Sequence, residues 1–216
     1  ARLQALWTLH ALNSLTESNL IAAINDPHPM VQNNAFRGVP ELRAVPSSNV
    51  FAAIIKTRDV SERTRLDTVL ALTQWTPNKD VISSVHKLFS VLKDSKDMWI
   101  KSAMLGVARL APTNFIRASF ASDKSDDFRE LVTPLVEDFI SKKDAGTATW
   151  ILSHAARQAP ATDKLKITVL NAFSKNLDQY APPASTNIDA ALDAFLKSES
   201  RSLRIAAFPV ISHYDK

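Results

Sequence analysis

The stretch from Ala22 to Ala35, which reads AAINDPHPMVQNNA, constrains the fold more than any other part of the sequence. A residue that precedes proline is pushed out of the α region, so Asp26-Pro27-His28-Pro29 must end one helix and form a tight turn. Apolar residues recur at helical spacing before this turn and again after it. The stretch therefore predicts a hairpin of two helices.

The same frame returns at intervals that are typical of repeated helical hairpins. Asp26, Asp59 and Asp94 open three predicted turns, which lie 33 and then 35 residues apart. A period of this size, built on a helix, a turn and a second helix, is the signature of an α-solenoid. We expect the fifth and ninth positions after each aspartate to pack between helices. These positions hold Val31, Thr64 and Trp99, then Ala35, Thr68 and Ala103, and the segment Ser198 to Ala207 repeats them with Leu203 and Ala207.

The composition favours an all-α fold. The chain has only three glycines in 216 residues, well below the average of about 7%, whereas tight β-hairpins and phosphate-binding loops both require glycine. It has no cysteine, which excludes thiolate nucleophiles and cysteine-ligated metals. No apolar run approaches the roughly 18 residues of a membrane span. We predict an α-α superhelix of about five to six helical hairpins, with no membrane insertion by this segment.

One continuous array over residues 1–216 is expected, because each hairpin leaves an apolar face that only its neighbours can cover. Ala1 begins inside a helical pattern and no methionine precedes it, which indicates a fragment of a longer protein. The frame loosens after Pro112, where Thr133-Pro134 predicts the start of a helix and Ala181 to Ser185 predicts an irregular loop.

The turn and the helix that follows it resemble HEAT repeats, in which Asp-Pro precedes a helix that begins hydrophobic-Arg-x-x-Ala. Residues Asp26 to Ala35 fit this pattern, with Gln32 in place of the usual arginine. Arg65 and Arg204 occupy the arginine position in their own repeats. The resemblance implies a HEAT-like solenoid.

Three segments resemble, more narrowly, the HEAT-like part of large bacterial membrane-bound dehydrogenase-type proteins. They are Ala1 to Leu9, the Asp-Pro-His-Pro turn, and Asp97 to Ala103. In that family the part lies between a sorbosone dehydrogenase-like propeller and a cytochrome c domain. The resemblance implies an exported, periplasmic redox protein in which this segment is the spacer. It covers roughly the first half of the chain, and the haem motif of an electron carrier is absent here.

The residue types that carry chemistry form no catalytic or metal-binding pattern, so we predict no enzyme, no metal and no cofactor. The five histidines are never three or four residues apart, so a metal site would need ligands from separate hairpins. Trp7 and Trp99 lie on stripes that should be core, and His154 is expected to pack against Trp150 on a helix face. Asp126-Asp127 and Glu137-Asp138 are adjacent pairs, and adjacent residues on a helix do not face each other.

Basic residues on the expected return helices are the best candidates for a binding surface. In a HEAT-like stack the second helix of each hairpin lines the concave side, where side chains of successive repeats converge. A solvated helix face with local ion pairs is the alternative interpretation. The candidate residues are Arg37, Arg65, Lys101, Arg109, Arg157 and Arg204.

These observations lead to a first hypothesis of a non-enzymatic scaffold that docks a protein or the neighbouring domains of its parent chain. The second hypothesis is a nucleic-acid-binding or base-excision module of the HEAT-like glycosylase type, which would use the basic stripe and the tryptophans. The net charge of +4 is modest and the signs are interspersed, which makes the second less favoured. A redox-linked module, with its haem or quinone in flanking segments, is the third.

Overall fold

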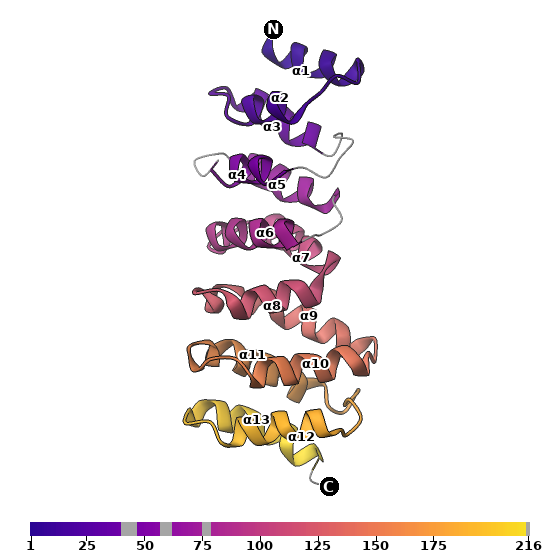
Figure 1. Ribbon diagram of the computed structural model, residues 1–216, viewed down its shortest axis with the longest axis vertical. Coiled ribbons are helices and arrows are strands. Elements are labelled where there is room, and N and C mark those ends of the chain that lie inside the picture. Colours follow the sequence, from indigo (N-terminus) through magenta and orange to yellow (C-terminus); the bar gives the residue numbers. More distant parts are fainter. Residues whose placement is uncertain (40–46, 57–61, 75–78, 215–216) are drawn as a thin grey trace. The chain divides into compact units, whose positions relative to one another are not determined.

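The computed structural model describes residues 1–39, 47–56, 62–74 and 79–214, and these residues form an all-α protein without strands (Figure 1). The chain divides into two compact units, Ala1–Ala111 and Pro112–Lys216, and within each unit the helices pack sequentially, which is consistent with a helical array. The predicted turn at Asp59 lies outside the described residues. The helices are α1 (Arg2–Ala11), α2 (Glu17–Ile24), α3 (Pro29–Gly38), α4 (Ser48–Lys56), α5 (Glu62–Ala71), η2 (Leu72–Gln74), α6 (Lys79–Leu92), α7 (Met98–Leu110), α8 (Pro112–Ala121), η3 (Ser125–Phe128), α9 (Arg129–Ser141), α10 (Ala145–Ala156), η4 (Pro160–Thr162), α11 (Asp163–Asn176), α12 (Thr186–Leu196) and α13 (Arg201–Tyr214).

Polar side chains define where several of these helices begin. Thr16 and Asn19 form a reciprocal capping box at the start of α2, and the Asp97 carboxylate accepts a hydrogen bond of 2.8 Å from the Trp99 amide at the start of α7. His28 caps α3, because its Nδ1 accepts from the Met30 amide at 3.2 Å. A cap of this kind typically stabilises a helix by about 1 kcal/mol. The proline turn is therefore closed by a histidine cap in addition to its two prolines.

In the first unit the helices form two rows. The odd row consists of α1, α3, α5 and α7, each packed against the next, and the even row of α2, α4 and α6 is built in the same way. The two rows meet where α2 packs against α3. A Cβ added to Gly38, the last residue of α3, would lie 3.2 Å from Leu20 Cδ2 of α2, so the glycine permits this close approach. α3 ends at Gly38.

The second unit is also built from two rows. One row contains α8, α10 and α12, and the other contains α9, α11 and α13, with α10 packed against both α9 and α11. Lys175 of α11 forms an ion pair of 3.1 Å with Glu137 of α9, and the Ser153 hydroxyl of α10 donates to the Asn187 carbonyl of α12. Polar contacts thus join neighbours within each row.

Helices α3, α5, α7, α9, α11 and α13 share one register of burial. Counted from the first residue of each helix, the third and the seventh side chains are buried in all six. Full burial of a Val, Leu or Ile side chain is worth about 1.5–3 kcal/mol, so these positions hold each helix against its neighbours. The frame predicted for Leu203 and Ala207 is confirmed. The pairs are Val31 and Ala35, Thr64 and Thr68, Ile100 and Met104, Leu131 and Leu135, Leu165 and Val169, and Leu203 and Ala207.

The predicted frame is wrong by one residue in α7. The predicted core positions Trp99 and Ala103 are not buried, since Trp99 is 74% exposed and Ala103 is half-buried, whereas Ile100 and Met104 are fully buried. The reason is the length of the turn. α3 starts three residues after Asp26, at Pro29, whereas α7 is capped by Asp97 and starts four residues after Asp94, at Met98. One extra residue rotates every following side chain by about 100° around the helix.

Pro134 also differs from its predicted role. It lies inside α9 and not at its first position, because the 3₁₀ turn η3 leads directly into a helix that begins at Arg129. The Thr133 hydroxyl donates to the Arg129 carbonyl at 3.1 Å and does not cap the helix. The loop predicted at Ala181 to Ser185 is confirmed.

The C-terminal end of α13 is tied to this loop by Tyr214. Its hydroxyl donates a hydrogen bond of 2.6 Å to the Pro182 carbonyl. Burial of the phenol, with a smaller effect of Tyr180, raises the pKa of Tyr214 to about 12. The neutral phenol is therefore the form that the folded protein prefers.

We predict that stability falls as pH rises from about 10 through about 12, because the unfolded chain loses the Tyr214 proton first. In an absorbance titration of the chain's two tyrosines, Tyr214→Phe should remove the step near pH 12 and lower the free energy of unfolding by about 1 kcal/mol. The chain unfolded in urea is the control and should titrate near pH 10. A step near pH 12 that persists in Tyr214→Phe would contradict the assignment.

Candidate interaction surface

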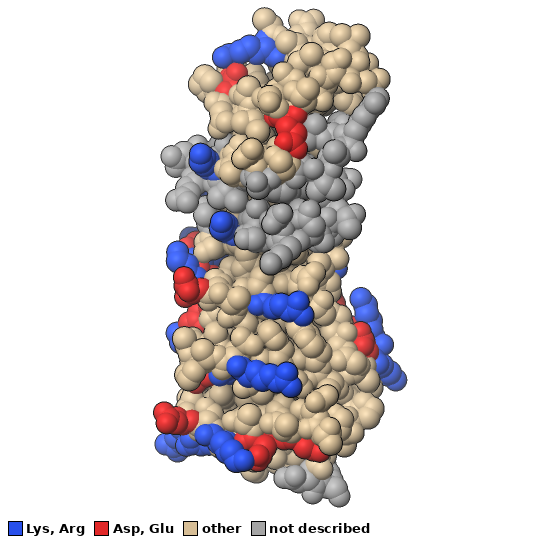
Figure 2. Space-filling model, viewed as in Figure 1, with Lys and Arg blue, Asp and Glu red and all other residues tan. Residues whose placement is uncertain are grey.

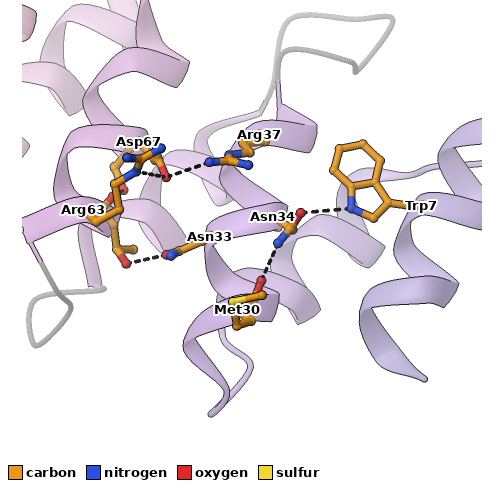
Figure 3. Close-up of polar contacts among 9 residues, drawn as sticks. Trp7, Met30, Asn33, Asn34, Arg37, Arg63 and Asp67 are labelled. Carbon is orange, nitrogen blue, oxygen red and sulfur yellow. Dashed lines mark hydrogen bonds and ion pairs between the residues drawn. The ribbon is translucent and has the colours of Figure 1, made fainter.

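Polar contacts join neighbouring helices along the odd row of the first unit (Figure 3). Trp7 of α1 donates its indole N–H to the Asn34 side-chain oxygen of α3 at 3.1 Å. The amide nitrogen of Asn34 donates in turn to the Met30 carbonyl at 2.7 Å. The half-buried Trp7 thus packs at a helix interface through a bond that fixes the rotation of α1 against α3.

The contacts continue from α3 to α5. Thr64 donates its hydroxyl to the Asn33 side-chain oxygen, and Asp67 lies 4.0 Å from Arg37 and 3.4 Å from Arg63 (Figure 3). Along α3 the contacting residues are Asn33 and then Arg37, and along α5 their partners are Thr64 and then Asp67. The order is the same in both helices, so α3 and α5 run parallel. We call this set of contacts the polar ladder; its residues are Trp7, Asn33, Asn34, Arg37, Arg63, Thr64 and Asp67.

The polar ladder is better suited to setting helix positions than to adding stability. The Arg37 and Arg63 side chains are largely exposed, and exposed ion pairs contribute about 0–1 kcal/mol. Hydrogen bonds at half-buried side chains are worth about 1 kcal/mol each, and they are directional. The ladder therefore specifies how neighbouring helices are rotated and how far they slide along one another.

An apolar edge lies at the beginning of α3 and α7. Met30, the second residue of α3, is 56% exposed, while Met98 and Trp99, the first two residues of α7, are 79% and 74% exposed. Met98 and Trp99 are consecutive exposed apolar residues, whereas Met30 lies on α3, which is separated from α7 by α5. Single exposed apolar side chains are common on soluble proteins, and contiguous ones are typical of interaction sites. The equivalent second position of α5, which packs between α3 and α7, is the exposed Arg63.

The six predicted binding residues do not lie in one row. Arg37, Arg65, Lys101 and Arg109 belong to helices of the odd row of the first unit. In the second unit, Arg157 follows the last residue of α10, whereas Arg204 lies on α13 of the other row. The structure thus brings four of the six onto neighbouring helices.

Several basic residues share the fourth helical position. Arg65, Lys101, Lys166 and Arg204 are each the fourth residue of their helix. Arg204 donates to the carbonyl oxygens of Ser198 and Glu199, the latter at 3.1 Å, in the turn before α13. Lys166 is buried and pairs with Asp163 at 2.9 Å in its own first turn. In α11 and α13 the basic side chain therefore binds polar groups at the start of its own helix, which is a structural role.

A second cluster lies between α8 and α10 in the second unit. The His154 ring stacks on Trp150 at 4.9 Å between centroids, Phe120 meets His154 edge-on, and the Arg117 guanidinium lies 5.4 Å from the Trp150 ring centroid. Burial lowers the pKa of His154, and the positive charges of Arg117 and Arg157 lower it further. His154 therefore packs against Trp150, as the sequence predicts, and this arrangement favours its neutral form.

The described residues hold no group of three or more His, Asp or Glu side chains positioned for a metal ion. No helix in the described ranges is long and apolar enough to cross a membrane. On the face that Figure 2 shows, Lys and Arg side chains are separated by other residues or lie beside Asp and Glu. The described basic residues on that face therefore form no continuous stripe.

In comparisons with known proteins, no family model matches the chain and no curated protein is significantly similar to it. The structure defines an all-α protein whose helices pack sequentially.

We predict that Trp7 and Asn34 are energetically coupled. Trp7→Phe and Asn34→Ala should each destabilise the protein, and the double variant should be about 1 kcal/mol more stable than additivity predicts, because the shared hydrogen bond is lost only once. Denaturant unfolding of the four proteins measures this coupling. Strictly additive values would show that the bond does not contribute to the folded state.

Proposed function

We propose that this chain is a non-enzymatic, HEAT-like helical scaffold that positions a protein partner or the neighbouring domains of its parent chain. The observation that carries the proposal is the shared register, in which the third and seventh residues of six helices are buried. Within each unit, a register repeated from helix to helix would present equivalent outward positions on neighbouring helices. An extended binding surface of this kind is the usual product of a repeat architecture.

The mechanism of such a scaffold is geometric. The polar ladder sets the rotation of α1, α3 and α5, so the outward side chains of these helices are held in place before a partner arrives. A preorganised surface loses less conformational entropy when it binds, so many weak contacts can together give a measurable affinity. The exposed Met30, Met98 and Trp99 provide the apolar part of this surface.

The narrower resemblance extends the proposal to the parent protein. The three segments that resemble dehydrogenase-type proteins support a role as the spacer between a propeller and a cytochrome c domain in an exported, periplasmic protein. In this role the array would fix the distance between the two redox ends, and the redox chemistry would belong to those ends.

Nucleic acid is the second candidate partner, and the exposure of Trp99 is the observation that favours it. Base stacking on an exposed aromatic ring is worth about 1–3 kcal/mol per base, and Lys101 lies two residues further along α7. The interspersed charges in Figure 2 favour it less, because nucleic-acid sites track the phosphate backbone with a basic groove. Binding of this kind would weaken steeply with salt.

Photo-crosslinking separates these proposals. A photoreactive amino acid replaces Ser102, which is exposed on α7 of the odd row, and in a matched control it replaces Lys87, which is exposed on α6 of the even row. In extract of the organism that encodes the chain, we expect discrete protein adducts from position 102 and none from position 87. Equal labelling at both positions, or none, would contradict the scaffold, and nuclease-sensitive adducts would favour the alternative.

A further inference from the structure

Helix α13 carries large apolar residues on one exposed side. Ile205 is 62% exposed and Phe208 is 65% exposed, and residues three apart on a helix are neighbours. Pro209, four residues after Ile205, is exposed on the same side. Contiguous exposed apolar side chains are typical of interaction sites. We call these three residues the α13 face.

The shared register shows how the same side is used in other helices. Counted from the first residue of α13, Ile205 is the fifth and Phe208 the eighth. In their own units, α3, α5, α9 and α11 are each followed in the row by another helix. In all four helices the fifth residue is half-buried and the eighth is fully buried, whereas α13, the last described helix of its row, exposes both. The fifth residues are Asn33, Leu66, Thr133 and Ile167, and the eighth are Phe36, Val69, Val136 and Leu170.

Side-chain contacts show that this side meets the next helix of the row. Asn33, the fifth residue of α3, accepts a hydrogen bond from Thr64, the third residue of α5. Glu137, the ninth residue of α9, pairs with Lys175 of α11 at 3.1 Å. The fifth and ninth residues of α13 both belong to the α13 face. The α13 face is therefore equivalent to the side on which α3 and α9 contact the helix that follows them.

The α13 face is uncharged. The neighbouring Arg204 donates to the carbonyl oxygens of Ser198 and Glu199 in the turn before α13. An uncharged side offers no basic groove to a phosphate backbone, so it suits an apolar occupant better than nucleic acid. The fifth, eighth, ninth and twelfth residues of α13 are Ile205, Phe208, Pro209 and Ser212.

The row also indicates what the occupant must present. Thr64 shows that an arriving helix places its third residue against the fifth residue of the helix before it. The third and seventh residues of the arriving helix lie on one side, because they are four apart. A second copy of α13 cannot offer these positions, because Leu203 and Ala207 are already buried in their own protein. The third and seventh residues of the other five helices of the register are buried in the same way.

We propose that the α13 face docks an amphipathic helix of the partner protein, with apolar side chains at the third and seventh positions of that helix. The inference rests on the proposed scaffold function and names a docking site and the chemistry of the partner. The partner helix continues the row of α9, α11 and α13. Its third residue packs on Ile205, and its seventh lies one turn further along, beside Phe208 and Pro209.

The test uses two fluorescein-labelled peptides of identical composition, titrated by fluorescence anisotropy. The probe is Ser-Ala-Glu-Leu-Lys-Ala-Ala-Leu-Lys-Ala-Ala-Lys-Ala-Ala, in which serine caps the helix and the leucines are its third and seventh residues. In the control peptide the second leucine exchanges with the alanine two residues before it, which places the leucines on opposite sides of the helix. The probe should bind about tenfold more tightly than the control peptide, because only the probe can bury both leucines.

Variants of the chain locate the binding site. Ile205→Ala and Phe208→Ala should each weaken the probe by about tenfold. Trp99→Ala is the matched control, because Trp99 is 74% exposed on α7 of the first unit, and it should leave probe binding unchanged. Circular dichroism and thermal unfolding should show that every variant keeps its helices. Equal binding of the two peptides, no binding, or insensitivity to Phe208→Ala would overturn the proposal.

Two further outcomes identify what fails. If the probe does not bind while position 102 still gives protein adducts, the docking proposal is wrong and the scaffold stands; loss of both removes both. If sedimentation shows that the chain self-associates and that Phe208→Ala abolishes the association, a second copy of this chain occupies the α13 face and the docking proposal is overturned.

Discussion

The rest of the structure depends on the burial of two side chains, the third and the seventh, in each of six helices. A single amphipathic helix cannot cover its own apolar stripe, and isolated helices of 10 to 14 residues are marginal in water. Neighbouring helices of a row remove these stripes from water for one another. The outward faces are then free to carry residues selected for other tasks, such as Arg63 and Trp99.

The all-α fold and the sequential packing of its helices could be predicted from the sequence because turn residues and apolar spacing are local signals. The Asp-Pro-His-Pro turn and the buried Leu203 and Ala207 both follow from residues that lie close together in the chain. The register of α7 could not be predicted by counting from Asp94, because Asp94 and Asp97 are both plausible caps and only the folded turn selects Asp97.

The candidate site was less accessible to sequence reasoning because it is made between helices. Asn33, Asn34 and Asp67 are ordinary polar residues on helix faces, and only the packing of α1, α3 and α5 turns them into a ladder. Lys166 was missed because a lysine at a helix start normally indicates solvent. The fourth-position pattern of basic residues was a usable signal, since it also contains Arg65, Lys101 and Arg204.

The shared register is tested most directly by cysteine accessibility, since the chain has no cysteine of its own. Single cysteines at Met30, Val31, Trp99 and Ile100 would be labelled with a maleimide under native conditions. The register predicts fast labelling of Met30→Cys and Trp99→Cys and strong protection of Val31→Cys and Ile100→Cys. Protection of Trp99→Cys together with fast labelling of Ile100→Cys would contradict it and would place Trp99 in the core.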